Sequence, residues 1–185
     1  MPPDPQLHRL RELLRERSVR RGDFVLASGR RSNFYVDARL TTMSGEGLEL
    51  IGRAGLARLQ ARGWSVTAVG GLTLGADPVA YAIALAARSQ GIALDAFTVR
   101  KAAKTHGTGK RIEGCFTPGA RVVVVEDVIT SGASARDAID VIRAERGHVV
   151  GVLAVVDREE GGRAAIEQAG IPVEALVLAS EILTE

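Results

Sequence analysis

The chain has 185 residues, a formal net charge of +2 at pH 7, and a composition that is 46% hydrophobic and 25% charged. This length is enough to bury one full core, and the composition argues against intrinsic disorder. The nearly balanced charge argues against a nucleic-acid-binding protein that relies on bulk positive charge, and aromatic residues at 4% argue against a base-stacking surface. We therefore expect a single domain, residues 1–185, without a nucleic-acid partner.

Cysteine, histidine and long apolar runs are scarce. The single cysteine, Cys115, excludes an internal disulfide and a cysteine zinc cluster, and the three histidines are too scattered to suggest a metal site. No apolar stretch reaches the ~20 residues of a membrane span, and the N-terminus has no signal-peptide pattern. The sequence thus predicts a cytoplasmic protein without a membrane partner.

The first part of the chain, residues 1–44, is expected to form a helix and a β-hairpin. Leucines recur at helical spacing among Arg and Glu in residues 5–17, which predicts an amphipathic helix. Strand-like runs at 24–27 and 33–40 flank a turn that contains Ser-Gly and suits a hairpin.

Residues 45–185 alternate between helical and strand patterns. A helix is expected at 45–62, ending near Gly63. Strands are expected at 66–70, 93–99, 121–126, 149–156 and 173–178, and helices between them at 76–90, 133–146 and 160–169. Such alternation predicts an α/β core, in which a parallel sheet is covered by helices on both faces. Ligands of such sheets bind at the carboxyl ends of the strands.

The most specific chemical pattern is residues 122–134, Val-Val-Val-Val-Glu-Asp-Val-Ile-Thr-Ser-Gly-Ala-Ser. The four valines are typical of a strand buried on both faces, and the acid pair is expected where that strand ends. A loop of small and hydroxyl residues follows, and then a helix begins. The free N–H groups at a helix N-terminus bind anions, usually phosphate.

The acid pair Glu126-Asp127 would repel a phosphate, so it must do something else. Carboxylates there can hold ribose hydroxyls or a Mg²⁺ shared with the ligand. The structural alternative is an ordinary strand-turn-helix, in which Asp and Ser or Thr only cap the helix.

The whole pattern resembles the phosphoribosyl pyrophosphate (PRPP) signature of the type I phosphoribosyltransferases. The resemblance implies an α/β core of that family, in which Glu126 and Asp127 contact the ribose hydroxyls and the loop wraps the 5′-phosphate. The loop residues so implied are Thr130, Ser131, Gly132, Ala133 and Ser134.

Residues 24–37 resemble the N-terminal segment of the orotate phosphoribosyltransferases, with a Ser-Gly turn, a second Ser and an aromatic pair. In that family the hairpin covers the base as a hood. The resemblance therefore implies base or hood contacts from Ser28, Gly29, Phe34 and Tyr35. The structural alternative is an edge hairpin whose aromatic side chains only fill the core.

Residues 98–114 hold five cations and three glycines. A basic, glycine-rich loop suits a polyanion, although a charge run can also be a solvated surface. The segment resembles the Arg-Lys-x-x-Lys-x-His-Gly loop of the orotate phosphoribosyltransferases. The resemblance implies that Arg100, Lys101, Lys104 and His106 contact pyrophosphate, and that the loop reaches into the neighbouring subunit's site.

Two further segments fit the same family. Residues 70–78 resemble its pyrophosphate loop, although Leu74 stands where some bacterial members have Lys, and Asp77 equally suits a helix cap. In the family an Arg after the strand at 149–156 meets the orotate carboxylate, which implies that role for Arg158. The structural alternative for Arg158 is a solvent-exposed position on the surface. The resemblance also implies that Thr130 of the phosphate loop contacts orotate.

Taken together, the resemblances imply an orotate phosphoribosyltransferase. Its substrates are PRPP and orotate, and Lys101, Lys104 and His106 stabilise the leaving pyrophosphate. Its cofactor is Mg²⁺, bound mainly through PRPP and without a dedicated protein metal site. The resemblance also implies a homodimer with shared active sites. Another purine or pyrimidine phosphoribosyltransferase is one alternative, and a PRPP-sensing regulator that binds nucleic acid is the other.

Overall fold

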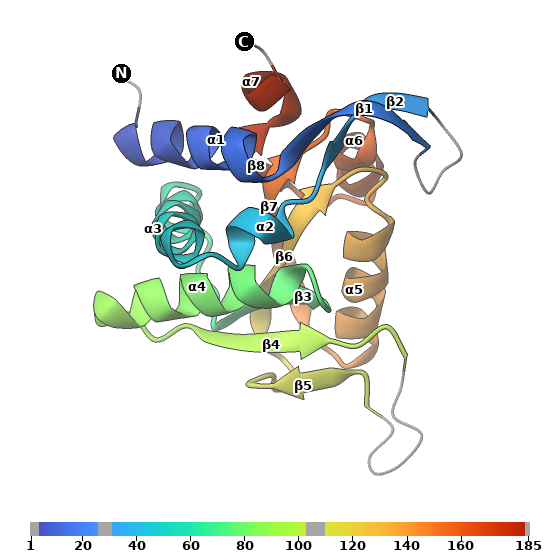
Figure 1. Cartoon of the computed structure of the whole chain (residues 1–185). Helices are drawn as coiled ribbons and strands as arrows, with labels where there is room; N and C mark the ends of the chain where they lie inside the picture. The colour runs from blue at the N-terminus through green and yellow to red at the C-terminus, as the bar shows by residue number, and fades with distance from the viewer. Residues whose placement is uncertain (1–3, 26–30, 103–109, 184–185) are drawn as a thin grey trace.

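A computed structural model describes residues 4–25, 31–102 and 110–183 of the chain. It is an α/β structure in which helices cover a six-stranded sheet and a separate two-stranded hairpin extends from the N-terminal helix (Figure 1). The α/β fold predicted from the sequence is therefore confirmed.

The six strands follow the order β5-β4-β3-β6-β7-β8 across the sheet. Their bounds are β3 Ala68–Leu72, β4 Asp95–Val99, β5 Ile112–Gly114, β6 Arg121–Ile129, β7 His148–Asp157 and β8 Val173–Leu178. All neighbouring strands run parallel except β4 and β5, which pair antiparallel at the edge. The carboxyl ends of the parallel strands consequently lie along one side of the sheet.

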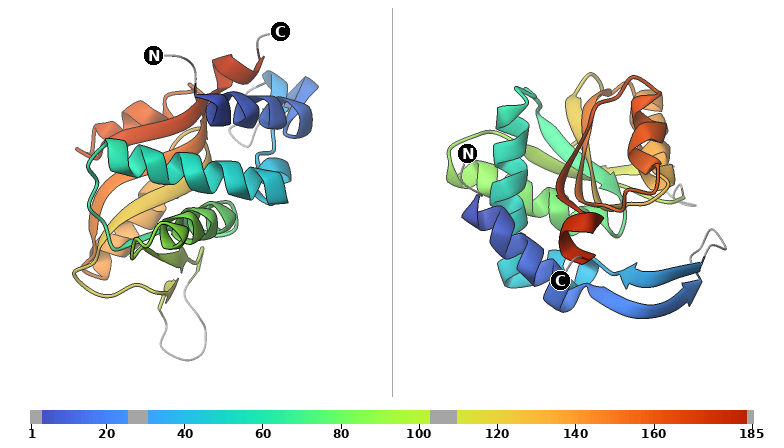
Figure 2. Two further views of the ribbon diagram at one scale, coloured as in Figure 1. Left: turned by 90° about the vertical axis from the view of Figure 1, so that its left-hand side faces the viewer. Right: turned by 90° about the horizontal axis from the view of Figure 1, so that it is seen from above.

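The helices form a layer on each face of the sheet. They are α1 Pro5–Arg17, α2 Arg39–Thr42, α3 Gly45–Ala61, α4 Ala76–Ser89, α5 Ala133–Ala144, α6 Gly162–Glu167 and α7 Ala179–Leu183. Figure 2 shows α1, α3 and α4 on one face and α5 and α6 on the other.

The central strand β6 is buried on both faces. Val123 and Val125 pack with the core under α3 and α4, whereas Val122 and Val124 pack with the core under α5. All four valines are fully buried. Each such side chain stabilises the fold by about 1.5–3 kcal/mol relative to an exposed one. The sheet is thus firmly held at the strand that carries the acid pair.

The hairpin consists of β1 Val19–Val25 and β2 Arg31–Val36, which pair antiparallel with Arg21 opposite Phe34. It begins directly after α1 and lies apart from the main sheet (Figure 1). The predicted turn with Ser28 and Gly29 lies outside the described residues.

The predicted first or last residues of several elements were wrong. The strand expected at 33–40 ends at Val36, because the backbone then turns into the short helix α2. The strand expected to begin at Phe24 begins at Val19. Neither β5 nor α7 was predicted. Strand β6 continues to Ile129, so the acid pair lies within the strand and not at its end.

Candidate active site

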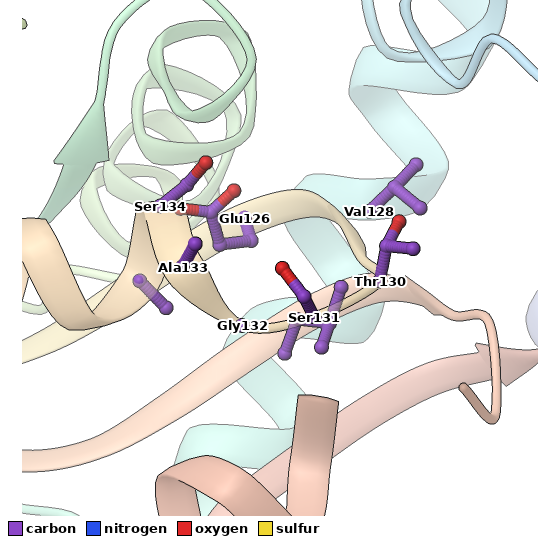
Figure 3. Close-up of a pocket in the computed structure, with 9 residues that line it drawn as sticks. Glu126, Val128, Thr130, Ser131, Gly132, Ala133 and Ser134 are labelled. Atoms are coloured by element: carbon purple, nitrogen blue, oxygen red, sulfur yellow. The ribbon is translucent and has the colours of Figure 1, made fainter. Parts of the chain in front are cut away.

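The carboxyl end of β6 and the N-terminus of α5 enclose a pocket of about 80 Å³ (Figure 3). It is lined by Glu126, Val128, Ile129, Thr130, Ser131, Gly132, Ala133, Ser134 and Ala135. Gly132 adopts a left-handed φ of 73°, and a Cβ there would come 2.9 Å from the carbonyl oxygen of Gly162. The loop therefore requires glycine at this turn, and it brings together all five residues predicted to hold the phosphate.

Glu126 extends from β6 into this pocket (Figure 3). The residue is 5% exposed, and its Oε1 has no hydrogen-bond partner among the described residues. Burial, and secondly the charge of Asp127, raise the pKa of Glu126 well above its ordinary value. An unsatisfied buried carboxyl group is costly, so the protein itself leaves Oε1 without the partner that such a group needs.

Asp127 follows Glu126 on the strand and therefore points to the other side. Its Oδ1 accepts a hydrogen bond from the N–H of Val128 at 2.9 Å. Gly75, in the loop after β3, packs so closely that a Cβ there would overlap the Asp127 carboxylate. Burial raises the pKa of Asp127, while the charge of Arg39 acts in the opposite direction. The two carboxyl groups thus face opposite sides of the strand.

A larger cavity, of about 490 Å³, lies beside the carboxyl ends of β3 and β4. It is lined by Thr73, Asp77, Tyr81, Thr98, Arg100, Lys101, Ala102 and Glu113. Two of the four residues predicted to contact pyrophosphate are therefore in one cavity. The other two, Lys104 and His106, lie outside the described residues.

Asp77 does not cap α4, so that expectation was wrong. The N-cap of α4 is Gly75, which has no side chain, and Pro78 is the third residue of the helix. Asp77 instead accepts hydrogen bonds from the hydroxyls of Thr73 at 2.6 Å and Thr98 at 2.8 Å. It joins the loop after β3 to the end of β4.

Arg158 immediately follows β7 and stacks on the hairpin. Its guanidinium carbon lies 4.7 Å from the centroid of the Phe34 ring, and its Nη2 pairs with Glu160 at 2.8 Å. The Arg158 side chain is only 4% exposed, so the alternative of a surface Arg is wrong. Two residues predicted to bind the base therefore meet at the carboxyl edge of the sheet.

Tyr35 neighbours Phe34 on β2 but contacts a different side chain. Its ring centroid lies 5.7 Å from that of Phe24, and the residue is 37% exposed. Its assignment to the orotate site stays a prediction. The same holds for Ser28, which lies outside the described residues.

Asp37 and Arg39 lie beside the site but were not predicted from the sequence. Arg39 donates to both oxygens of Asp37, at 2.8 and 3.0 Å, and its charge acts on Asp127. The available signal was the Asp-x-Arg spacing after the aromatic pair, which is typical of a turn into a helix. It was obscured because the preceding strand was expected to continue to Leu40.

The described part of the chain contains no group of three or more His, Cys, Asp or Glu side chains placed to hold a metal ion. Within the same residues, none of the helices has the length and apolar character needed to cross a membrane.

Known proteins closely resemble the chain over nearly its full length. The orotate phosphoribosyltransferase of Aquifex aeolicus (strain VF5) is 46% identical over 178 residues, which cover 95% of this chain and 96% of the relative. No family model matches the chain.

Solved structures resemble it equally well. A crystal structure of Mycobacterium tuberculosis H37Rv orotate phosphoribosyltransferase with Fe(III) dicitrate has a TM-score of 0.85 and 44% identity, covering 97% of this chain and 100% of that one. A crystal structure of the same enzyme with PRPP has a TM-score of 0.81 and 42% identity, covering 96% and 99%. The resemblance inferred from the motifs is therefore confirmed, and the chain belongs to the orotate phosphoribosyltransferases, a family of phosphoribosyl-transferring enzymes.

Proposed function

We propose that this protein transfers the phosphoribosyl group of PRPP to N1 of orotate, which yields orotidine 5′-monophosphate and pyrophosphate for pyrimidine biosynthesis. The observation that carries this proposal is the phosphate-loop pocket, which contains a buried carboxyl group without a protein partner. The family relationship supports the reaction, and this pocket would hold the 5′-phosphate of PRPP.

The 5′-phosphate of PRPP would bind the N–H groups of residues 130–134 at the positive end of α5. Glu126 and Asp127 would accept hydrogen bonds from the ribose hydroxyls. The acid pair would thus hold the sugar, while the N–H groups of the loop hold the phosphate.

Orotate would bind between the hairpin and the end of β7. The planar guanidinium of Arg158 suits the orotate carboxylate, and Phe34 holds that guanidinium by its ring face. Ser28, Tyr35 and Thr130 are further proposed contacts. We propose that residues 1–44 act as a hood over residues 45–185 within one domain.

The leaving pyrophosphate would lie in the cavity beside Arg100 and Lys101, with Lys104 and His106 as further contacts. As the bond from C1′ to the pyrophosphate oxygen stretches, negative charge grows on the leaving group. Cations that strengthen their contact with this charge accelerate the reaction. The N1–H proton of orotate must leave as the bond from N1 to C1′ forms, and the departing pyrophosphate can take it up.

Mg²⁺ is proposed to bind mainly through PRPP itself. The carboxyl oxygens of Glu126, in the phosphate-loop pocket, are hard donors, which suits a cation that keeps most of its ligands from the substrate. When bound, it would neutralise charge on the leaving pyrophosphate.

The protein is proposed to act in the cytoplasm as a homodimer with shared active sites. Large exposed hydrophobic side chains lie on α2 and directly after it, in the β3–α4 loop and on α4, which are neighbours in Figure 1. They are Leu40, Met43, Leu74, Tyr81 and Leu85. Exposed apolar side chains gathered on adjacent elements suit a protein interface, and this one would adjoin the PRPP site.

The test is pyrophosphate release from PRPP and Mg²⁺ with orotate, uracil, adenine or hypoxanthine as the acceptor. Release with orotate alone is the expected result. Release with another base would identify a different phosphoribosyltransferase. Binding of RNA or DNA without turnover of any base would favour a regulator.

A further inference from the structure

Arg111 connects the two ends of the basic segment to helix α5. Its Nε donates to the carbonyl oxygen of Arg100 at 2.9 Å, and the N–H of Arg100 donates to the carbonyl oxygen of Arg111 at 2.7 Å. The Arg111 guanidinium also binds both carboxylate oxygens of Asp137, at 2.9 and 2.7 Å. One side chain therefore fixes a backbone position and a helix at the same time.

The elements that Arg111 joins belong to two different anion sites. Arg100 and Lys101 line the cavity proposed for pyrophosphate. Asp137 is the fifth residue of α5, the helix whose N-terminus forms the phosphate loop. The connection thus spans the two ends of PRPP as the proposed function places them.

The ion pair between Arg111 and Asp137 is better suited to positioning neighbouring groups than to stabilising the fold. The side chains of Arg111 and Asp137 are 26% and 42% exposed, and ion pairs in such surroundings contribute little to stability. A planar guanidinium that makes three directed hydrogen bonds nevertheless fixes distance and orientation. Small misplacements of groups that act in the transition state lower reaction rates strongly.

We propose that Arg111 is a positioning residue, which holds Arg100 and Lys101 in a fixed relation to the phosphate loop through Asp137. This inference rests on the proposed function for the identity of the two anion sites. Arg111 would act through its neighbours and would not itself contact substrate.

The experiment compares steady-state kinetics of the wild type with Arg111→Ala, Arg111→Lys, Asp137→Ala and the double Ala variant, well below the unfolding temperature of each. Each single substitution should lower kcat about 10-fold or more, with the KM for orotate changed less than about 2-fold. The double variant should be no worse than Arg111→Ala, because both remove the same connection. Arg111→Lys should not restore the wild-type kcat, since an ammonium group cannot make all three hydrogen bonds of the Arg111 guanidinium.

A matched ion pair far from the site serves as the control. Arg58 of α3 pairs with Glu174 of β8 at 2.8 Å, with side chains 33% and 17% exposed. Arg58→Ala should change the unfolding temperature little and leave kcat unchanged. An equal fall in kcat would show that any loosened ion pair has this effect, and it would overturn the proposal.

Two other results would overturn it. A wild-type kcat in Arg111→Lys would mean that only the charge matters. A wild-type kcat in Asp137→Ala would mean that Arg111 acts alone. If the wild type turns over no orotate, the proposed function fails, and calorimetry with pyrophosphate then tests Arg111 separately. Arg111→Ala should weaken pyrophosphate binding about 10-fold, whereas unchanged binding would refute the positioning role.

Discussion

Glu126 illustrates the conflict between stability and function at a single residue. Its carboxyl group is buried in the phosphate-loop pocket, and Oε1 has no partner among the described residues. The fold alone gains nothing from this group, because burial penalises its charged form. A ligand hydroxyl would supply the partner that the protein does not.

The substitution Glu126→Gln should therefore stabilise the free protein at neutral pH. The folded pKa of Glu126 lies above its ordinary value of 4.5, so this residue lowers stability as pH rises from about 4.5 through the folded pKa. The gain arises from the ionisation penalty of the buried carboxyl group, which the neutral Gln does not carry, and it should vanish below about pH 4.5, where both side chains are neutral. Urea unfolding at a series of pH values measures it.

The same variant should bind PRPP more weakly, because the carboxylate contact to the ribose is lost. Glu167→Gln, at the exposed end of α6, is the control and should change neither property. Equal urea midpoints for wild type and Glu126→Gln at all pH values would contradict the assigned environment of Glu126.

At the scale of elements, the site depends on how closely the β3–α4 loop approaches β6. Gly75 packs against the Asp127 carboxylate, and any Cβ at this position would overlap it. Asp127 also hydrogen-bonds the backbone of Val128, so it has little freedom to move away. The loop and the strand must therefore fit together before Asp127 can hold a ribose hydroxyl.

Gly75→Ala should consequently weaken PRPP binding by about 10- to 100-fold through displacement of Asp127 or of the loop. Calorimetry with PRPP measures the change. Gly63→Ala is the control, because Gly63 has a left-handed φ of 63° with open space around it. That variant should lose about 1 kcal/mol of stability and keep its PRPP affinity. An unchanged affinity in Gly75→Ala would refute the close fit.

Local patterns in the sequence were sufficient for much of this architecture. A strand was expected at 173–178, and β8 has these limits, Val173–Leu178. The loop at 130–134 follows the valine-rich strand β6, as the sequence of residues 122–134 predicted. These elements are defined by neighbours in sequence. Burial on two faces requires continuous apolar residues, and a turn before a helix requires glycine and hydroxyl residues.

Contacts between distant segments could not be predicted in the same way. The stacking of Arg158 on Phe34 and the approach of Gly75 to Asp127 depend on tertiary packing. Helix α2 was missed for a local reason, since the Asp37 side chain accepts from the N–H of Arg39 and so favours a turn over the expected strand. The short edge strand β5 is recognisable only through its pairing with β4.

At the scale of the whole molecule, the proposed dimer makes each active site from two chains. Lys104→Ala and Asp127→Asn should each be nearly inactive alone. If the basic loop serves the partner's site, a mixed dimer regenerates one intact site. Activity should recover toward about a quarter of wild type after random reassortment, because about half of the dimers are mixed and each has one good site of two.

Subunit exchange in this experiment is verified by mass. Mixing Lys104→Ala chains with Lys104→Ala, Asp127→Asn chains is the control, since no combination restores an intact site. An absence of recovery despite confirmed exchange would mean that the loop serves its own chain, and the shared-site dimer would then be wrong.

The most direct test of orotate as the substrate compares kcat/KM for orotate and uracil, which lacks the carboxylate, in the wild type and in Arg158→Ala. Arg163→Ala, which breaks a neighbouring 2.9 Å ion pair to Asp157, is the control. The wild type and Arg163→Ala should prefer orotate by at least about 10³-fold, because a site built for a polar group rejects an analogue without it. Arg158→Ala should lose most of this preference through a raised KM for orotate, with PRPP affinity nearly intact. A wild type that uses uracil as well as orotate, or an Arg158→Ala variant that keeps its preference, would contradict the account.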